Sequence, residues 1–398
     1  MTSTARTDNP TPVPDPETLR QRARQLAPEL ESQSHACNDR RDLSDDIVDR
    51  MRAGDLFRIL QPRRWGGFEM DPRVLFDIQN IFARACASSA WVYGVLSVQS
   101  FVVSLFDTRA QEDVWGGDGR TLVSSSFQPV GKVEKTDEGF LISGRWSFSS
   151  GSSHADWALL GGMVPPDDAK GSPAMTLFLV PKSDYRIEEN WDTFGLRGTG
   201  SNDIVADKAF VPRYRSHQPA PGIVPIVGDA PDLPPFYRLP WLYLFTSSIS
   251  NLGIGAARGA LDKFLSVERE RVSSTTGRVA REDPRVHEIA ARTAAEIETS
   301  EAMYKRHIQR FMDCIERQAP LPMSEGMCYR TQLTSVIRKL AGLVDEMQVL
   351  LGGRGVHFDS PLTRVWLDLL AARAHPGNDP ANIAPGFGKL LLETPAGE

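Results

Sequence analysis

The spacing of apolar residues divides the chain into three parts, and the first is helical. From Pro16 to Phe106 the apolar positions recur every three or four residues, which is the period of amphipathic helices. Trp91 to Phe106 is almost wholly apolar or small, so this stretch predicts a buried helix. We therefore expect an N-terminal helical domain over residues 16–121, preceded by a disordered tail over residues 1–15.

From Leu122 onward the apolar period shortens to that of strands. Phe140 and Ile142 alternate with polar neighbours, and the four residues before Phe140, TDEG, are typical of a hairpin turn. Prolines stand where the strands should end. We expect a central β domain over residues 122–235.

After Trp241 the helical period returns, and it predicts a C-terminal bundle over residues 236–398. The last predicted helix runs from Leu362 to Ala374 and should end before Pro376, because the residue preceding a proline disfavours the helical conformation. His375 then lies at a helix C-terminus, facing a polar loop. The residues alone leave open whether its imidazole caps the last carbonyls or acts in catalysis.

Composition narrows the function classes. The 398 residues are 41% hydrophobic and 24% charged, as in soluble globular proteins, and the formal net charge of −6 argues against a nucleic-acid partner. The four cysteines form no CxxC pair, which argues against a zinc ribbon or a disulfide framework. No apolar run approaches the roughly 18 residues of a membrane span, and no signal peptide is evident. We expect a cytoplasmic protein with no membrane contact.

The sequence shows neither a dinucleotide-binding fingerprint after a predicted strand nor histidines at metal-ligand spacing. The glycines of GIGAARG and GGRG lie within or between helical patterns, whereas a dinucleotide fingerprint needs a preceding strand. The seven histidines show no metal-ligand spacing, so we predict no metal site.

One segment of the β domain, RWSFSSGSSHADW from Arg145 to Trp157, is unusually rich in hydroxyls. Alternation along a strand predicts that Ser147 and Ser149 share one face, opposite Phe148. That face could bond the edge of a planar ligand, although an edge strand with serines toward water would have the same pattern. The later segment GLRGTGSND predicts a tight loop.

These segments, with GGRG before the last helix and RAHPGNDP after it, carry a family resemblance. Across nearly the whole chain the sequence resembles the acyl-CoA dehydrogenase superfamily, and within it the reduced-flavin-dependent monooxygenases. The resemblance implies an α+β, mostly α fold: an N-terminal helical domain, a central β-barrel or sandwich and a C-terminal four-helix bundle. It also implies a homotetramer built on that bundle.

The resemblance also implies the chemistry. Dehydrogenases of the superfamily use a glutamate after the last long helix, whereas this chain has only Asp379 there, and His375 matches the histidine of the oxygenase branch. The implied cofactor is reduced FMN or FAD from a separate flavin reductase. It would react with O2 to give a C4a-hydroperoxide that hydroxylates a small aromatic or heteroaromatic molecule. Ser149 near flavin N5 and His375 near the peroxide are the implied catalytic residues.

The remaining site residues follow from the same resemblance. It implies that Arg271 reaches the cofactor phosphate of a neighbouring subunit. The full implied cofactor set is Ser126, Ser147, Ser149, Arg271, Gly352 and Gly353. The implied substrate pocket contains Gln99, Ser126 and His375.

Gln99 departs from the family pattern. Phenol hydroxylases of this kind carry a histidine close to that position, and a glutamine cannot act as a base. Either another group deprotonates the substrate, or the substrate is an indole, a sulfur heteroaromatic, a quinone precursor or an amine. Three other functions stay open: an acyl-CoA dehydrogenase-like flavin oxidoreductase, an amine N-oxygenase of the same fold, and a non-catalytic binding protein.

Overall fold

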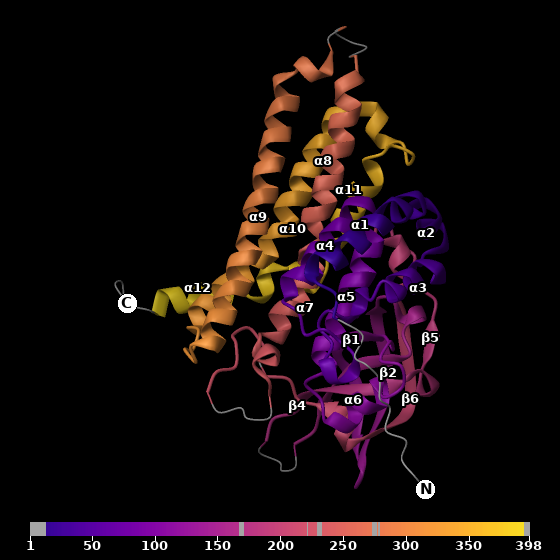
Figure 1. Ribbon diagram of the computed structural model, residues 1–398, viewed down its shortest axis with the longest axis vertical. Helices are drawn as coiled ribbons and strands as arrows, with labels where there is room; N and C mark the ends of the chain where they lie inside the picture. The colour runs from indigo at the N-terminus through magenta and orange to yellow at the C-terminus, as the bar shows by residue number, and fades with distance from the viewer. Residues whose placement is uncertain are drawn as a thin grey trace.

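The computed structural model describes residues 13–166, 171–220, 222–228, 233–272, 277 and 279–393. A seven-stranded sheet and the N-terminal helices lie at one end of the molecule, and longer helices extend away from them (Figure 1). The predicted tail lies outside the described residues except for its last three. Among these, Asp15 accepts a 2.9 Å hydrogen bond from the backbone N–H of Thr18 and caps the first helix.

The N-terminal region is helical, as its apolar period predicts. Every residue of its fifth helix is buried, because the helix runs between the sheet and the C-terminal helices, and this confirms the buried helix predicted there. The helices are α1 (Pro16–Ser32), α2 (Ser34–Arg40), α3 (Asp45–Ala53), α4 (Pro72–Ala85), α5 (Ala87–Val103) and α6 (Thr108–Trp115).

The sheet has the order β5-β6-β2-β1-β3-β4-β7. Its central strand β1 pairs antiparallel with β2 and parallel with β3, and α5 packs against β1. The fully buried Trp146 anchors the strands, because its indole N–H donates to the carbonyl of Gly161 at 2.7 Å. The strands are β1 (Val123–Lys135), β2 (Gly139–Ser149), β3 (Trp157–Val164), β4 (Ala174–Pro181), β5 (Arg186–Glu188), β6 (Asn202–Pro212) and β7 (Ser216–His217).

The C-terminal helices pack against one another and against α4 and α5. Figure 1 shows the three longest, α8, α9 and α10, side by side and running away from the sheet. The predicted fourth helix is present, but it is only ten residues long and ends at Ala372, two residues before its predicted end. The helices are α7 (Trp241–Ser250), α8 (Leu252–Glu270), α9 (Pro284–Glu316), α10 (Met323–Leu351), α11 (Thr363–Ala372) and α12 (Ala384–Glu393).

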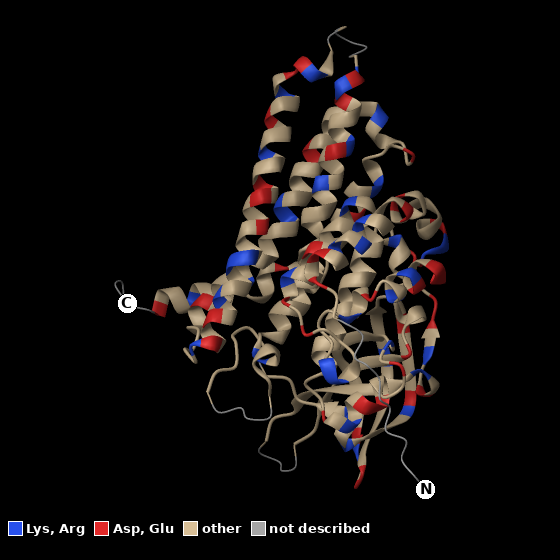
Figure 2. Cartoon of the chain, viewed as in Figure 1, with Lys and Arg blue, Asp and Glu red and all other residues tan. Residues whose placement is uncertain are grey.

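Short 3-10 turns connect these elements: η1 (Leu56–Arg58), η2 (Arg63–Trp65), η3 (Ser152–His154), η4 (Lys182–Asp184), η5 (Arg197–Thr199), η6 (Arg213–Arg215), η7 (Pro235–Arg238), η8 (Ala280–Glu282), η9 (Gly352–Val356), η10 (Pro376–Asn378) and η11 (Pro380–Asn382). Figure 2 shows acidic and basic residues interspersed along the helices and strands. Among the described helices, none combines the length and the apolar character needed to cross a bilayer.

Candidate active site

The serine-rich end of β2 departs from regular alternation. The register against β6 shifts between Trp146 and Ser149, and Phe148 adopts a φ of +65° with its side chain exposed. Because the bulge inserts one residue, Ser149 lies on the same face as Trp146. The predicted common face of Ser147 and Ser149 is therefore wrong, since a bulge reverses the alternation from that point on.

The bulge leaves Ser149 with an unused hydroxyl. The residue is fully buried, and its Oγ has no hydrogen-bond partner among the described residues. An orphaned buried hydroxyl costs about 1–3 kcal/mol, so it marks a place where a bound molecule can supply the missing partner. A flavin ring, whose edge carries nitrogens and carbonyl oxygens, fits that requirement.

A chain of hydrogen bonds fixes the backbone next to Ser149. The indole N–H of Trp91 donates to Ser150 Oγ at 2.9 Å, and Ser150 Oγ lies 2.7 Å from Ser201 Oγ. Ser201 Oγ lies in turn 2.6 Å from Thr199 Oγ1 in the GLRGTGSND loop. The two segments singled out in the sequence are therefore one structural unit.

Ser126 and Ser147 join β1 to β2 beside this unit. The hydroxyl of Ser126 donates to the carbonyl of Ser147 at 2.8 Å. Ser126 is buried, whereas Ser147 is half-buried. The structure thus places the three implied serines on neighbouring strand ends, although the hydroxyl of Ser126 already has a backbone acceptor.

His375 follows α11 and begins the turn η10. Its Nδ1 accepts the backbone N–H of Gly377 at 2.9 Å, so the imidazole caps the following turn and not the last carbonyls of α11. A nitrogen that accepts a hydrogen bond carries no proton, which places the proton of the neutral ring on Nε2. Burial, reinforced by the nearby charge of Arg330, lowers the pKa of His375 to about 4.

Trp91 connects the two implied catalytic residues. Its ring meets the His375 ring edge-on, with centroids 5.6 Å apart, while its indole N–H holds Ser150, the residue after Ser149. One buried side chain on α5 therefore contacts both the histidine and the serine segment. Sequence reasoning missed Trp91, because nothing in a uniformly buried helix distinguishes one aromatic residue from the rest.

The substrate side of the site involves Gln99 on α5. Its Nε2 donates to Ser125 Oγ at 2.9 Å, while its Oε1 is buried and has no partner among the described residues. Two residues further along β1, the ring of Phe127 lies 4.7 Å from that of Phe245 and 5.8 Å from that of Trp241. An unpaired amide oxygen and, further along β1, a group of half-buried aromatic rings together suit a planar molecule with an N–H or O–H group.

The structure does not bring Arg271, Gly352 and Gly353 to this site. They follow α8 and α10 at the end of the bundle remote from the sheet (Figure 1). The guanidinium of Arg271 makes two hydrogen bonds, of 2.7 and 2.6 Å, to the buried carboxylate of Glu268. A Cβ built on Gly352 or Gly353 would meet no atom within 4 Å, so these residues border open space.

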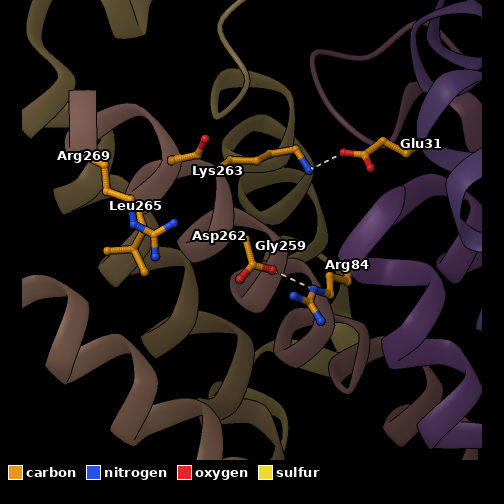
Figure 3. Close-up of a pocket in the computed structure, with 8 residues that line it drawn as sticks. Glu31, Arg84, Gly259, Asp262, Lys263, Leu265 and Arg269 are labelled. Carbon is orange, nitrogen blue, oxygen red and sulfur yellow. Dashed lines mark hydrogen bonds and ion pairs between the residues drawn. The ribbon is translucent and has the colours of Figure 1, made fainter. Parts of the chain in front are cut away.

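The open groove in Figure 3 is a separate feature. Its volume is about 430 Å³, and it lies between α1, α4 and α8. Two ion pairs cross it, Lys263 to Glu31 at 2.8 Å and Arg84 to Asp262 at 2.6 Å. Because these charges neutralise one another far from Ser149, we do not assign the chemistry to this groove. Within the described residues, no group of three or more His, Cys, Asp or Glu side chains could hold a metal ion.

Known proteins resemble this chain in sequence and in structure. The family described as "Acyl-CoA dehydrogenase, C-terminal domain" matches residues 247–380. The chain is 32% identical to the flavin-dependent monooxygenase oxygenase subunit HsaA of Rhodococcus jostii, over 94% of this chain and 98% of the relative. It is 30% identical to the oxygenase component of an FADH2-dependent resorcinol hydroxylase of Rhizobium sp., over 82% of each chain. The crystal structure of 3-HSA hydroxylase from Rhodococcus sp. RHA1 matches with a TM-score of 0.87 and 30% identity, over 96% of this chain and 98% of that one.

Proposed function

Because this chain belongs to the oxygenase subunits of flavin-dependent monooxygenases, which have the acyl-CoA dehydrogenase fold, we propose that it hydroxylates a small aromatic or heteroaromatic compound with reduced flavin and O2. The observation that carries this proposal is an orphaned buried hydroxyl, Ser149, and a neutral imidazole, His375, that are linked through Trp91, which bonds Ser150 and meets the His375 ring. The first can bind the flavin, and the second can donate a hydrogen bond to an oxygen atom.

Each residue has a defined task in this proposal. Reduced flavin, when bound, supplies the electrons that activate O2. Ser149, whose buried hydroxyl has no partner among the described residues, would hold the flavin by donating a hydrogen bond to its edge. Trp91 covers the space between Ser149 and His375 and keeps water out, which limits the wasteful release of hydrogen peroxide. His375 offers the proton on Nε2 and, with a pKa near 4, stays neutral at physiological pH.

The position of Asp379 disfavours acyl-CoA dehydrogenation. Its carboxylate accepts the backbone N–H of Ala381 at 3.1 Å and lies 3.5 Å from Arg338. A carboxylate that caps a turn and pairs with an arginine is poorly placed to remove a proton from a substrate. The structural role of Asp379 therefore supports oxygenation over dehydrogenation.

For the substrate, we propose a planar ring with one hydrogen-bond donor. The buried Gln99 Oε1 lacks a partner and can accept from an N–H or O–H group, and the rings of Phe127, Phe245 and Trp241 offer aromatic contacts. Indoles and hydroxylated aromatics satisfy both requirements.

We further propose a homotetramer in the cytoplasm that receives reduced flavin from a separate reductase. Arg271, Gly352 and Gly353 then serve the flavin of a neighbouring subunit. Supporting this, three large apolar residues near the end of α10 are strongly exposed in the single chain: Val349 at 72%, Val356 at 77% and Phe358 at 84%. Contact with another subunit would bury them.

The test begins with anaerobic titration of the protein with reduced FMN and, separately, reduced FAD. The flavin that binds is then mixed with O2 and a panel of indoles, phenols and sulfur heteroaromatics, and hydroxylated product and hydrogen peroxide are both measured. Product formation with binding of one reduced flavin is expected. Failure to bind either flavin would favour a non-catalytic role, and reduction of bound oxidised flavin by an acyl-CoA would favour a dehydrogenase.

A further inference from the structure

Arg330 carries a buried positive charge. It lies on α10, is only 6% exposed, and forms no ion pair with any carboxylate in the described ranges. Its Nη1 is buried and has no hydrogen-bond partner there. Burial lowers its pKa to about 10, so the guanidinium stays charged at neutral pH. Burying a charged side chain in this way lowers the stability of the fold, so a role is expected for its charge and for its hydrogen bond to the backbone.

The hydrogen bond that Arg330 does form links it to His375 through Gly377. Arg330 Nη2 donates to the carbonyl of Gly377 at 2.8 Å, and the N–H of the same glycine donates to His375 Nδ1 at 2.9 Å. Gly377 is thus held on one side by the guanidinium while it holds the imidazole on the other. A Cβ at this position would lie 3.0 Å from His375 Nδ1, so little room exists for the glycine to shift toward the ring.

We propose that Arg330 is a positioning residue that fixes the tautomer and orientation of His375 through Gly377, a role that rests on the proposed function of His375. With Gly377 held, its N–H stays on Nδ1 and the ring presents its proton at Nε2. Without the guanidinium, the Gly377 carbonyl loses its side-chain donor, so the Gly377 N–H is less firmly held on Nδ1 and either ring nitrogen can carry the proton.

Other side chains hold the rest of this turn in place. Arg330 is therefore not needed to keep the turn folded, and its role at Gly377 differs from a purely structural one. The buried Asn378 donates to the carbonyl of Ala372 at 2.8 Å and accepts from Ser250, and Arg338 Nε donates to the carbonyl of Asn378 at 3.0 Å. These bonds fix the turn one residue after Gly377. Apart from His375 itself, Arg330 is the only one of the described side chains that bonds Gly377.

The electrostatic surroundings of His375 point to the same residue. From α10 the charged groups near the turn are Arg330 and Arg338, and Arg338 is compensated by Asp379 at 3.5 Å. On the α5 and α7 sides the neighbours are the uncharged Trp91 and Ser250. Burial lowers the pKa of His375 most, and Arg330 is the charge that lowers it further. The guanidinium therefore also opposes a second proton on the ring.

The first experiment reads the tautomer without any flavin chemistry. The full chain is labelled with ¹⁵N-histidine, and the ring nitrogen signals of His375, identified by their loss in His375→Asn, are followed with pH before flavin is added. The unmodified protein is expected to show a neutral ring protonated at Nε2. Arg330→Met should give mixed tautomers and a titration midpoint higher by about one pH unit. Arg330→Lys, which keeps a donor and the charge, should restore most of both signals.

Arg338→Met is the matched control, because it removes an arginine from the same helix that bonds the same turn at Asn378 and not at Gly377. It should leave the tautomer and the midpoint unchanged. If Arg330→Met does not fold, Arg330→Gln, which is uncharged and shorter, takes its place and should shift the tautomer and the midpoint in the same direction, whereas Arg338→Met should not. Unchanged His375 signals in a folded Arg330→Met or Arg330→Gln protein would overturn the proposal.

Turnover then separates the two levels of inference. The ratio of product to hydrogen peroxide should fall about tenfold in Arg330→Met and recover in part in Arg330→Lys. If His375→Asn leaves that ratio unchanged, the function proposed for His375 fails, whatever the tautomer shows. If His375→Asn lowers the ratio but Arg330→Met does not, only the role of Arg330 fails.

Discussion

Two regions of the molecule differ in whether a single chain completes them: the site around Trp91, and the end of the bundle remote from the sheet. At the sheet, Ser149 and His375 are held by buried residues from α5, β2 and the turn after α11. At the bundle end, Gly352 and Gly353 border open space, and large apolar side chains are exposed nearby. One chain therefore positions the groups proposed for the chemistry, whereas the groups proposed for the cofactor phosphate would need a second copy to complete their site.

The largest expected effect comes from His375→Asn. Loss of a positioned proton donor should lower product formation about 100-fold, with electrons diverted to hydrogen peroxide and reduced-flavin binding retained. Product and peroxide are measured in single turnovers. The control is His35→Asn, which changes an exposed histidine on α2, outside both regions. Equal effects of the two substitutions would remove His375 from the chemistry.

A subunit-mixing experiment tests whether the two regions meet across an interface. Ser149→Ala and Arg271→Ala should each reduce flavin-dependent product formation about tenfold, the value of roughly one hydrogen bond to a charged or buried group. Mixed and reassembled, the two variants should recover activity, because the Ser149 of one chain then faces the Arg271 of the other. Absence of recovery in verified mixed oligomers would place Arg271 outside the shared site.

Two glycine substitutions compare the packing of the regions. Gly151 has a φ of +66°, and a Cβ there would lie 3.0 Å from Val92 on α5, so Gly151→Ala should destabilise the protein by about 1–3 kcal/mol. Gly353→Ala meets no neighbour within 4 Å and should change the stability of the isolated chain very little. Chemical denaturation of both variants gives the difference. Similar losses would mean that the bundle end is also packed.

The smallest expected effect is an absence of pH dependence. The pKa of His375 is lowered from 6.5 to about 4, so the ring gains its second proton only as the pH falls through about 4. Product formed per flavin oxidised should therefore stay constant from pH 5.5 to pH 8. A decline with a midpoint near 6.5 on acidification would show that His375 is not shielded.

Several features of the fold and the site could be predicted from the sequence, whereas others could not. The apolar run after Trp91 predicted a buried helix because burial on all faces requires apolar residues on all faces. Regular alternation placed Ser149 on the wrong face, because the bulge at Phe148 has no local signature. Proline at position 376 predicted a helix end, but not that the imidazole of His375 would cap the following turn.

The helical and strand periods, the residue types available for chemistry and the family resemblance can be read from the chain alone, because they depend on neighbouring residues. The contacts of Trp91 with the serine segment and His375, the bond from Arg330 to Gly377 and the separate position of Arg271 became visible only in the folded molecule. These facts join residues separated by tens to hundreds of positions. Such contacts follow from how whole helices and strands pack, which local periodicity does not encode.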